Sequence, residues 1–192
     1  DHGYAVMVDS SNNIYITGLT YGGLDGNSNS GYEDIFLVKY NSSGVKEWTK
    51  QFGESSGEYG LGLKVDSLNN IYVTGFTNGG LDDNTNSGGM DIFLVKYNSS
   101  GVKQWTKQLG TSATEYGYGV TVDSSDNIYV TGMTGGGLDG NTNSSSISGD
   151  YDIFLVKYNS SGDKQWTKQL GTSSTDHGYA VMVDSSNNIY IT

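Results

Sequence analysis

The chain has 192 residues and a formal net charge of −11, because 21 acidic side chains are set against only 10 lysines and no arginine. A phosphate-binding surface needs clustered basic groups, with arginine favoured for bidentate contacts, so we expect neither nucleic acid nor an anionic membrane surface as a partner. Cysteine is absent, which excludes disulfides and thiolate chemistry, and no apolar run approaches the ~18 residues of a membrane span, so we expect no membrane insertion.

The sequence repeats one unit three times and then begins a fourth. The phrase VDSSNN returns with small changes at intervals of 57, 57 and 61 residues. One aspartate marks it in each unit: Asp9, Asp66, Asp123 and Asp184. One tryptophan in each complete unit keeps the same steps: Trp48, Trp105 and Trp166. Periods of this length are typical of stacked supersecondary units.

The two ends of the chain share one sequence. Residues 1–17 and 176–192 both read DHGYAVMVDSSNNIYIT, whereas the corresponding stretches 58–74 and 115–131 differ from it at eight and six of 17 positions. Two interpretations stay open: a window on a longer array with a super-repeat of 175 residues, or head-to-tail assembly in which the last two strands lie where another molecule's first two would lie. Because the chain lacks an initial Met and stops where the other units continue with Thr-Gly, we expect it to be a fragment.

The first unit predicts four strands in chain order. Residues 4–8 form a short apolar run, and residues 14–17, after a DSSNN turn, are β-branched and aromatic. A long Gly/Asn/Asp loop precedes residues 35–40, which are apolar on both faces, and an NSSG turn leads to residues 45–52. Strand runs joined by short Asx and Gly turns indicate hairpins, and no stretch shows a helical period. The sequence therefore predicts an all-β fold.

Four antiparallel strands in about 57 residues make one blade of a β-propeller. Inner strands packed on both faces should be continuously apolar, whereas the outermost strand should protect its open edge with charge, as Lys46, Glu47 and Lys50 do. A parallel β-helix is the main alternative, but its coils are usually shorter and lack alternating tight turns. We therefore predict β-propeller blades, three complete and one half: blade 1 at 1–57, blade 2 at 58–114, blade 3 at 115–175, and the first two strands of a further blade at 176–192.

The units resemble the SBBP family of bacterial β-propeller repeats. The family pattern joins a D-s-x-x-N-i-Y-v-T-G phrase, a D-x-f-l-x-K-y-n-x-x-G phrase and a W-t-x-q-x-G phrase. The first unit matches it at Asp9, Asn13, Tyr15, Thr17, Gly18, Asp34, Phe36, Lys39, Tyr40, Gly44, Trp48, Gln51 and Gly53. The resemblance covers essentially the whole chain. It implies a part of a large bacterial protein, often secreted or surface-displayed, with no common enzymatic activity.

The long loops between the second and third strands offer one candidate metal site per unit. Each loop places oxygen-bearing side chains at positions 1, 3 and 5, which is what a calcium loop provides. The candidate ligands are Asp25, Asn27, Asn29 and Glu33 in unit one, Asp82, Asn84 and Asn86 in unit two, and Asp139, Asn141 and Asn143 in unit three. Only unit one has a carboxylate at position 9, since Met90 and Ile147 stand there in the others. A solvated, turn-forming Asx loop accounts for the same residues.

Other repeated residues have both a functional and a structural interpretation. The aspartates ahead of the third strands could be paired acids in a channel, or could accept backbone N–H groups: Asp34, Asp91 and Asp152. The tryptophans could be stacking platforms for sugars, but recurrence at one strand position favours packing between blades. His2 and His177 have no evident partner, and no Ser/His/Asp set or phosphate-binding motif occurs. We expect no catalytic residues and no cofactor.

These observations favour a non-enzymatic scaffold, on a bacterial surface or outside the cell, whose loop faces contact protein or glycan. We also expect the chain to pack against itself or to belong to a longer array. The alternative is a lectin-like or calcium-dependent binding module that uses the long loops. A third hypothesis, a lyase or hydrolase, is disfavoured, because enzymes on symmetric folds normally carry residues unique to one unit. The unique features here are small: Glu33 and the four extra residues at about 145–148.

Overall fold

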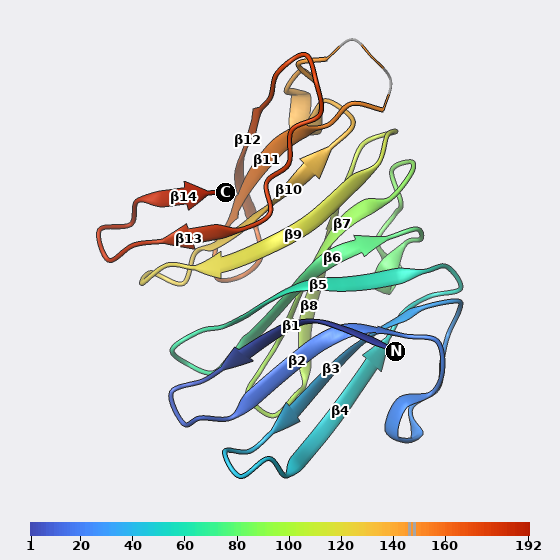
Figure 1. The fold of residues 1–192 in the computed structure, drawn as a ribbon, viewed down its shortest axis with the longest axis vertical. Coiled ribbons are helices and arrows are strands. Elements are labelled where there is room, and N and C mark those ends of the chain that lie inside the picture. Colours follow the sequence, from blue (N-terminus) through green and yellow to red (C-terminus); the bar gives the residue numbers. More distant parts are fainter. Residues whose placement is uncertain (146, 148) are drawn as a thin grey trace.

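A computed structural model describes residues 1–145, 147 and 149–192; the extra loop residues at 146 and 148 lie outside the described residues. Three four-stranded antiparallel sheets are stacked face to face, followed by a two-stranded sheet (Figure 1). Each sheet is a meander, with its strands paired in chain order. The predicted all-β fold of propeller blades is confirmed.

The strands of the four sheets are as follows. Blade 1 contains β1 (His2–Val8), β2 (Ile14–Thr20), β3 (Asp34–Tyr40) and β4 (Lys46–Phe52). Blade 2 contains β5 (Glu58–Val65), β6 (Ile71–Thr77), β7 (Asp91–Tyr97) and β8 (Lys103–Leu109). Blade 3 contains β9 (Glu115–Val122), β10 (Ile128–Thr134), β11 (Asp152–Tyr158) and β12 (Lys164–Leu170). The half-blade contains β13 (Val181–Val183) and β14 (Ile189–Ile191).

Each long loop contains a single 3-10 turn that the sequence did not predict: η1 (Leu24–Gly26), η2 (Leu81–Asp83) and η3 (Leu138–Gly140). The central aspartate of each turn has a left-handed backbone, with φ of 54° at Asp25, 49° at Asp82 and 52° at Asp139. Aspartate tolerates this conformation because its short side chain bonds locally. No helix among the described residues has the length and apolar character needed to cross a membrane.

The DSSNN turn owes its shape to its aspartate. The Asp9 carboxylate accepts hydrogen bonds from the Ser11 and Asn13 backbone N–H groups, both at 2.9 Å, and from the Tyr15 hydroxyl at 3.0 Å. Although burial acts to raise the pKa of Asp9, hydrogen bonds from Asn13, Tyr15 and Ser11 lower it below its usual value. The same bonds recur in the other three units, so the repeated phrase encodes one turn.

The core lies between neighbouring sheets. One buried cluster joins blades 1 and 2, and a second joins blades 2 and 3. The innermost strands β1, β5, β9 and β13 lie close to one another along the stack (Figure 1). A Cβ atom at Gly62 of β5 would stand 2.6 Å from the Tyr118 carbonyl oxygen of β9, so this strand position requires glycine for close approach.

Candidate functional site: the two open blade faces

Each blade has two apolar faces, and blade 2 shows both of them covered. Its leading face, which packs against blade 1, includes Leu63, Val65, Phe93 and Tyr97. Its trailing face, which packs against blade 3, includes Tyr72, Ile92 and Leu94. Because side chains alternate along a strand, one strand contributes to both faces. The terms leading face and trailing face are used below for the corresponding residues of every blade.

The leading face of blade 1 is open. Val6 corresponds to Leu63 in register, yet Val6 is 62% exposed and Leu63 only 7%. Val8, which corresponds to the buried Val65, is also exposed. The apolar face continues onto β3, where Phe36 and Val38 correspond to Phe93 and Val95 of blade 2. No preceding blade covers these residues in the part of the chain that the structure describes.

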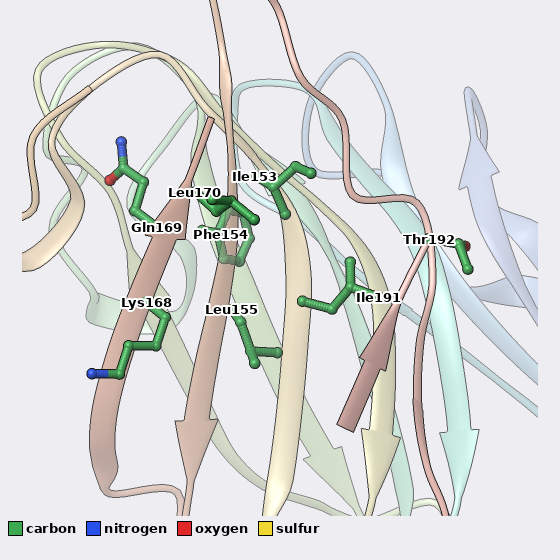
Figure 2. Close-up of a pocket in the computed structure, with 8 residues that line it drawn as sticks. All are labelled: Ile153, Phe154, Leu155, Lys168, Gln169, Leu170, Ile191 and Thr192. Atoms are coloured by element: carbon green, nitrogen blue, oxygen red, sulfur yellow. The ribbon is translucent and has the colours of Figure 1, made fainter. Parts of the chain in front are cut away.

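The trailing face of blade 3 is open at the other end of the stack. Leu170 is 72% exposed, whereas its counterpart in blade 1, Phe52, contacts Phe93 and Tyr97 of blade 2 with ring centroids 6.4 Å and 5.8 Å apart. Beside Leu170 lies an apolar pocket of about 260 Å³ (Figure 2). It is lined by Ile153, Phe154, Leu155, Lys168, Gln169, Leu170, Ile191 and Thr192. Large exposed apolar patches mark interaction sites.

The half-blade sits on blade 3 as an inner half-blade should. Val181 of β13 is only 6% exposed because β13 packs against β9 and β10. Tyr190 of β14, on the opposite face, is 55% exposed, whereas the same tyrosine in residues 1–17, Tyr15, is fully buried against blade 2. One sequence therefore buries its trailing face at the N-terminal end of the stack and its leading face at the C-terminal end.

The candidate calcium loops are held by internal bonds. The Asp25 carboxylate accepts hydrogen bonds from the Lys46 ammonium and the Thr49 hydroxyl, which lower its pKa below the usual value. Asp82 and Asp139 make the same pair of bonds, to Lys103 and Thr106 and to Lys164 and Thr167. Calcium would have to displace the lysine in every unit.

The remaining candidate ligands bond to nearby backbone instead of converging. The Asn27, Asn84 and Asn141 amides donate to the leucine carbonyl three residues earlier, at 2.7–2.8 Å. The Asn29, Asn86 and Asn143 amides donate to Gly31, Gly89 and Asp150 carbonyls. Glu33 lies against Gly57 at the junction with blade 2. Within the described ranges no group of three or more His, Asp or Glu side chains is arranged for a metal. Calcium binding stays a prediction.

The aspartates at the start of the third strands brace the long loops. Asp34 Oδ2 accepts hydrogen bonds from the Ser30 backbone N–H and from the Gln51 side-chain amide, both at 2.9 Å. Gln51 in turn accepts the Leu24 backbone N–H at 2.8 Å. Asp91 with Gln108, and Asp152 with Gln169, repeat this arrangement. The bracing glutamine was not singled out from the sequence, although its recurrence three residues after each tryptophan was visible.

The tryptophans pack between blades. A Cβ atom at Gly101, in the NSSG turn of blade 2, would stand 3.1 Å from the Trp48 indole of blade 1. Gly162 of blade 3 lies in the same way against Trp105. Each indole also contacts a tyrosine of its own blade, with ring centroids 6.1–6.4 Å apart. His2 is exposed, and His177 stacks on Tyr179 at 5.4 Å. The structure brings no catalytic partner to either histidine among the described residues.

Comparison with known proteins identifies the repeat. Residues 47–82, 104–139 and 165–192 match the SBBP family, a beta-propeller repeat. The chain belongs to this family. The matched stretches begin in the fourth strand of one blade and run into the long loop of the next, so each of the first two includes a complete blade junction.

Two curated relatives and one solved structure are similar to the chain. An uncharacterized WD repeat-containing protein of Acanthamoeba polyphaga mimivirus is 29% identical over 180 residues, covering 76% of this chain and 13% of the relative. The regulatory protein FlaEY of Caulobacter vibrioides is 26% identical over 175 residues, covering 85% of this chain and 18% of the relative. The extracellular domain of a putative one-component system from B. thetaiotaomicron shares the fold, with a TM-score of 0.50, 16% identity, and coverage of 100% of this chain and 20% of that one.

Proposed function

We propose that the chain is a non-enzymatic interaction scaffold, displayed on a bacterial surface or outside the cell, that continues its blade stack by binding a second molecule head to tail. Membership of a beta-propeller repeat family and similarity to a WD repeat-containing protein support the scaffold role. The location rests on the resemblance to secreted and surface-displayed repeats. The observation that carries the assembly is that residues 1–17 and 176–192, identical in sequence, leave opposite apolar faces uncovered.

The half-blade defines how the second molecule would dock. In blade 1, β2 pairs with β3 through Ile14–Tyr40, Tyr15–Lys39 and Ile16–Val38. Residues 189–191 of β14 have the same sequence as 14–16 of β2, but the structure gives β14 no third strand among the described residues. In the assembly, β14 pairs with β3 of the second molecule and completes a composite blade. The second molecule's own residues 1–17 are released.

The exchange is favourable because it adds buried surface. Identical residues replace one another beside β3 and against blade 2, so those contacts are lost and remade in equal number. The gain is the apolar surface around Leu170, which Phe36 and Tyr40 of the second molecule would cover, as Phe93 and Tyr97 cover Phe52 inside the chain. Burial of apolar surface stabilises by roughly 25 cal/mol per Å². Head-to-tail contacts of this kind close into rings or extend into filaments. The next blade of a longer array would make the same contacts.

Two deletions test the composite blade by size-exclusion chromatography with light scattering. Removal of residues 176–192 takes away the donor strands, so we expect a monomer. Removal of residues 1–17 frees the place beside β3, so we expect assembly at least as strong as that of the full chain. A full chain that stays monomeric at all concentrations contradicts self-assembly. Assembly that persists without residues 176–192, or is lost without residues 1–17, contradicts strand exchange and indicates another contact.

A further inference from the structure

A pair of buried carboxyl groups lies at each of the two complete blade junctions. Asp34 at the start of β3 and Glu58 at the start of β5 are both fully buried, and so are Asp91 and Glu115 at the next junction. The backbone joins the two blades at the same place, because the Glu58 N–H donates to the Glu33 carbonyl at 2.9 Å. The Glu115 N–H donates in the same way to the Met90 carbonyl.

One oxygen atom of each buried aspartate has no hydrogen-bond partner. Oδ2 of Asp34 and of Asp91 accepts the bonds that brace the long loop, but Oδ1 of each is buried and unpaired. Asp34 Oδ1 and Glu58 Oε2 lie within 2.5 Å and 2.6 Å of the point where a Cβ atom on Gly53 would stand. They are therefore at most about 5 Å apart, within the range of about 4–6 Å in which like charges disfavour each other.

No cation compensates the pair. The charged groups that act on Glu58 are Asp34 on β3 and Glu54 in the turn before β5, both acidic, while β6 contributes only the Thr77 hydroxyl. The charged group that acts on Glu115 is Asp91, and the turn and β10 contribute Thr111 and Thr134. An uncompensated buried charge is costly, and carboxyl groups in such sites take up a proton instead.

We propose that each junction is a proton-binding site, in which Asp34 with Glu58, and Asp91 with Glu115, hold one shared proton and thereby strengthen the contact between blades in mild acid. The proton comes from solvent and forms an O–H bond on the pair, and Oδ1 of the aspartate is a free acceptor for it. A proton needs no cavity, whereas the Gly53 backbone leaves little room for an ion beside these oxygens. This site is independent of the assembly proposed above.

The direction of the pH effect follows from the shifted glutamate. Burial first, and the neighbouring acids after it, raise the pKa of Glu58 from 4.5 to about 7, and burial also raises the pKa of Glu115. The folded chain then binds protons that the unfolded chain releases between pH 4.5 and about 7. The unfolding free energy contributed by these groups therefore falls as pH rises through this window, and is recovered as pH falls.

The test is thermal unfolding of the full chain from pH 4.5 to 8, compared with E58Q, E115Q and the double variant. We expect the midpoint of the wild-type chain to rise by several degrees from pH 8 to pH 5, and the double variant to lose most of this rise. E47Q is the control, because Glu47 is exposed on β4 and pairs with Lys39 at 2.8 Å. An unchanged pH slope in the double variant would overturn the proposal.

Two further measurements distinguish a bound proton from a bound metal ion and from an unperturbed carboxylate. Carboxyl-carbon NMR of the wild-type chain should give a titration midpoint for Glu58 well above that of Glu47, which needs no variant to fold. Equal midpoints overturn the proposal. Calcium chloride at pH 8 should leave the wild-type unfolding temperature unchanged relative to the double variant. A calcium-dependent rise seen only in the wild-type chain would show that a metal ion, not a proton, occupies the pair.

Discussion

Residues 1–17 and 176–192 have one sequence and two environments. Both segments form the same hairpin around the same aspartate turn, with Val6–Ile16 pairing matched by Val181–Ile191. Yet the first segment buries Tyr15 and exposes Val6, whereas the second buries Val181 and exposes Tyr190. The turn and the strand pairing are therefore set locally, by the sequence of the segment. Which face is buried is set by the neighbouring blade alone.

The ends of the stack, and not its loops, are for this reason the strongest candidate interaction surface. A hairpin built to be covered on both faces is covered on one face at each end. The uncovered face is apolar in both cases, while the long loops are closed by their own lysine, threonine and glutamine contacts. Stacking repeats bury a continuous core only through their neighbours, so the terminal faces are the points of weakest burial.

The largest expected difference between the two segments is at their tyrosine. In dilute monomer, Y15A should lower the free energy of unfolding by about 3–5 kcal/mol, because the ring is fully buried between blades 1 and 2. Y190A should change it by less than about 0.5 kcal/mol, as for an exposed position. Both substitutions remove the same hydrogen bond to an aspartate, Asp9 or Asp184, so that bond cancels in the difference. Urea unfolding measures both, and equal effects would contradict the burial of Tyr15.

A smaller difference is expected between two tryptophans at one strand position. Trp105 and Trp166 are half-buried, and each contacts a tyrosine of its own blade. Only Trp105 also packs on the glycine turn of a following blade, at Gly162. We expect W105A to cost about 2–3 kcal/mol, less than the 3–5 kcal/mol of a fully buried ring, and W166A about 1 kcal/mol. Similar losses of unfolding free energy in urea would assign the stabilisation to the blade itself and not to the junction.

The sequence predicted what is repeated and missed what is unique to one place. Repetition of VDSSNN, IFLVKY and the tryptophan was enough for strand order, turns and blade boundaries, because these depend on local residue types. The 3-10 turns were missed because one turn of three residues leaves no periodic signal. The calcium pattern of Asp25, Asn27 and Asn29 was visible, but the lysine and threonine that bind Asp25 lie on β4, more than 20 residues away. The half-unpaired carboxylates of Asp34 and Asp91 depend on contacts between blades, which no local pattern reveals.

The smallest expected effect reverses the order of the two ends and tests how they meet. V181A removes two methyl groups from a side chain packed on blade 3, so we expect it to weaken docking of the half-blade by about 1–2 kcal/mol. V6A should leave monomer stability unchanged because Val6 is exposed. Under strand exchange β1 leaves the composite blade, so V6A should also leave the dissociation constant of the assembly unchanged, while V181A raises it roughly tenfold, as about 1.4 kcal/mol requires. If V6A weakens assembly and V181A does not, blade 1 must dock intact with β13 displaced. Analytical ultracentrifugation of the two variants distinguishes these outcomes.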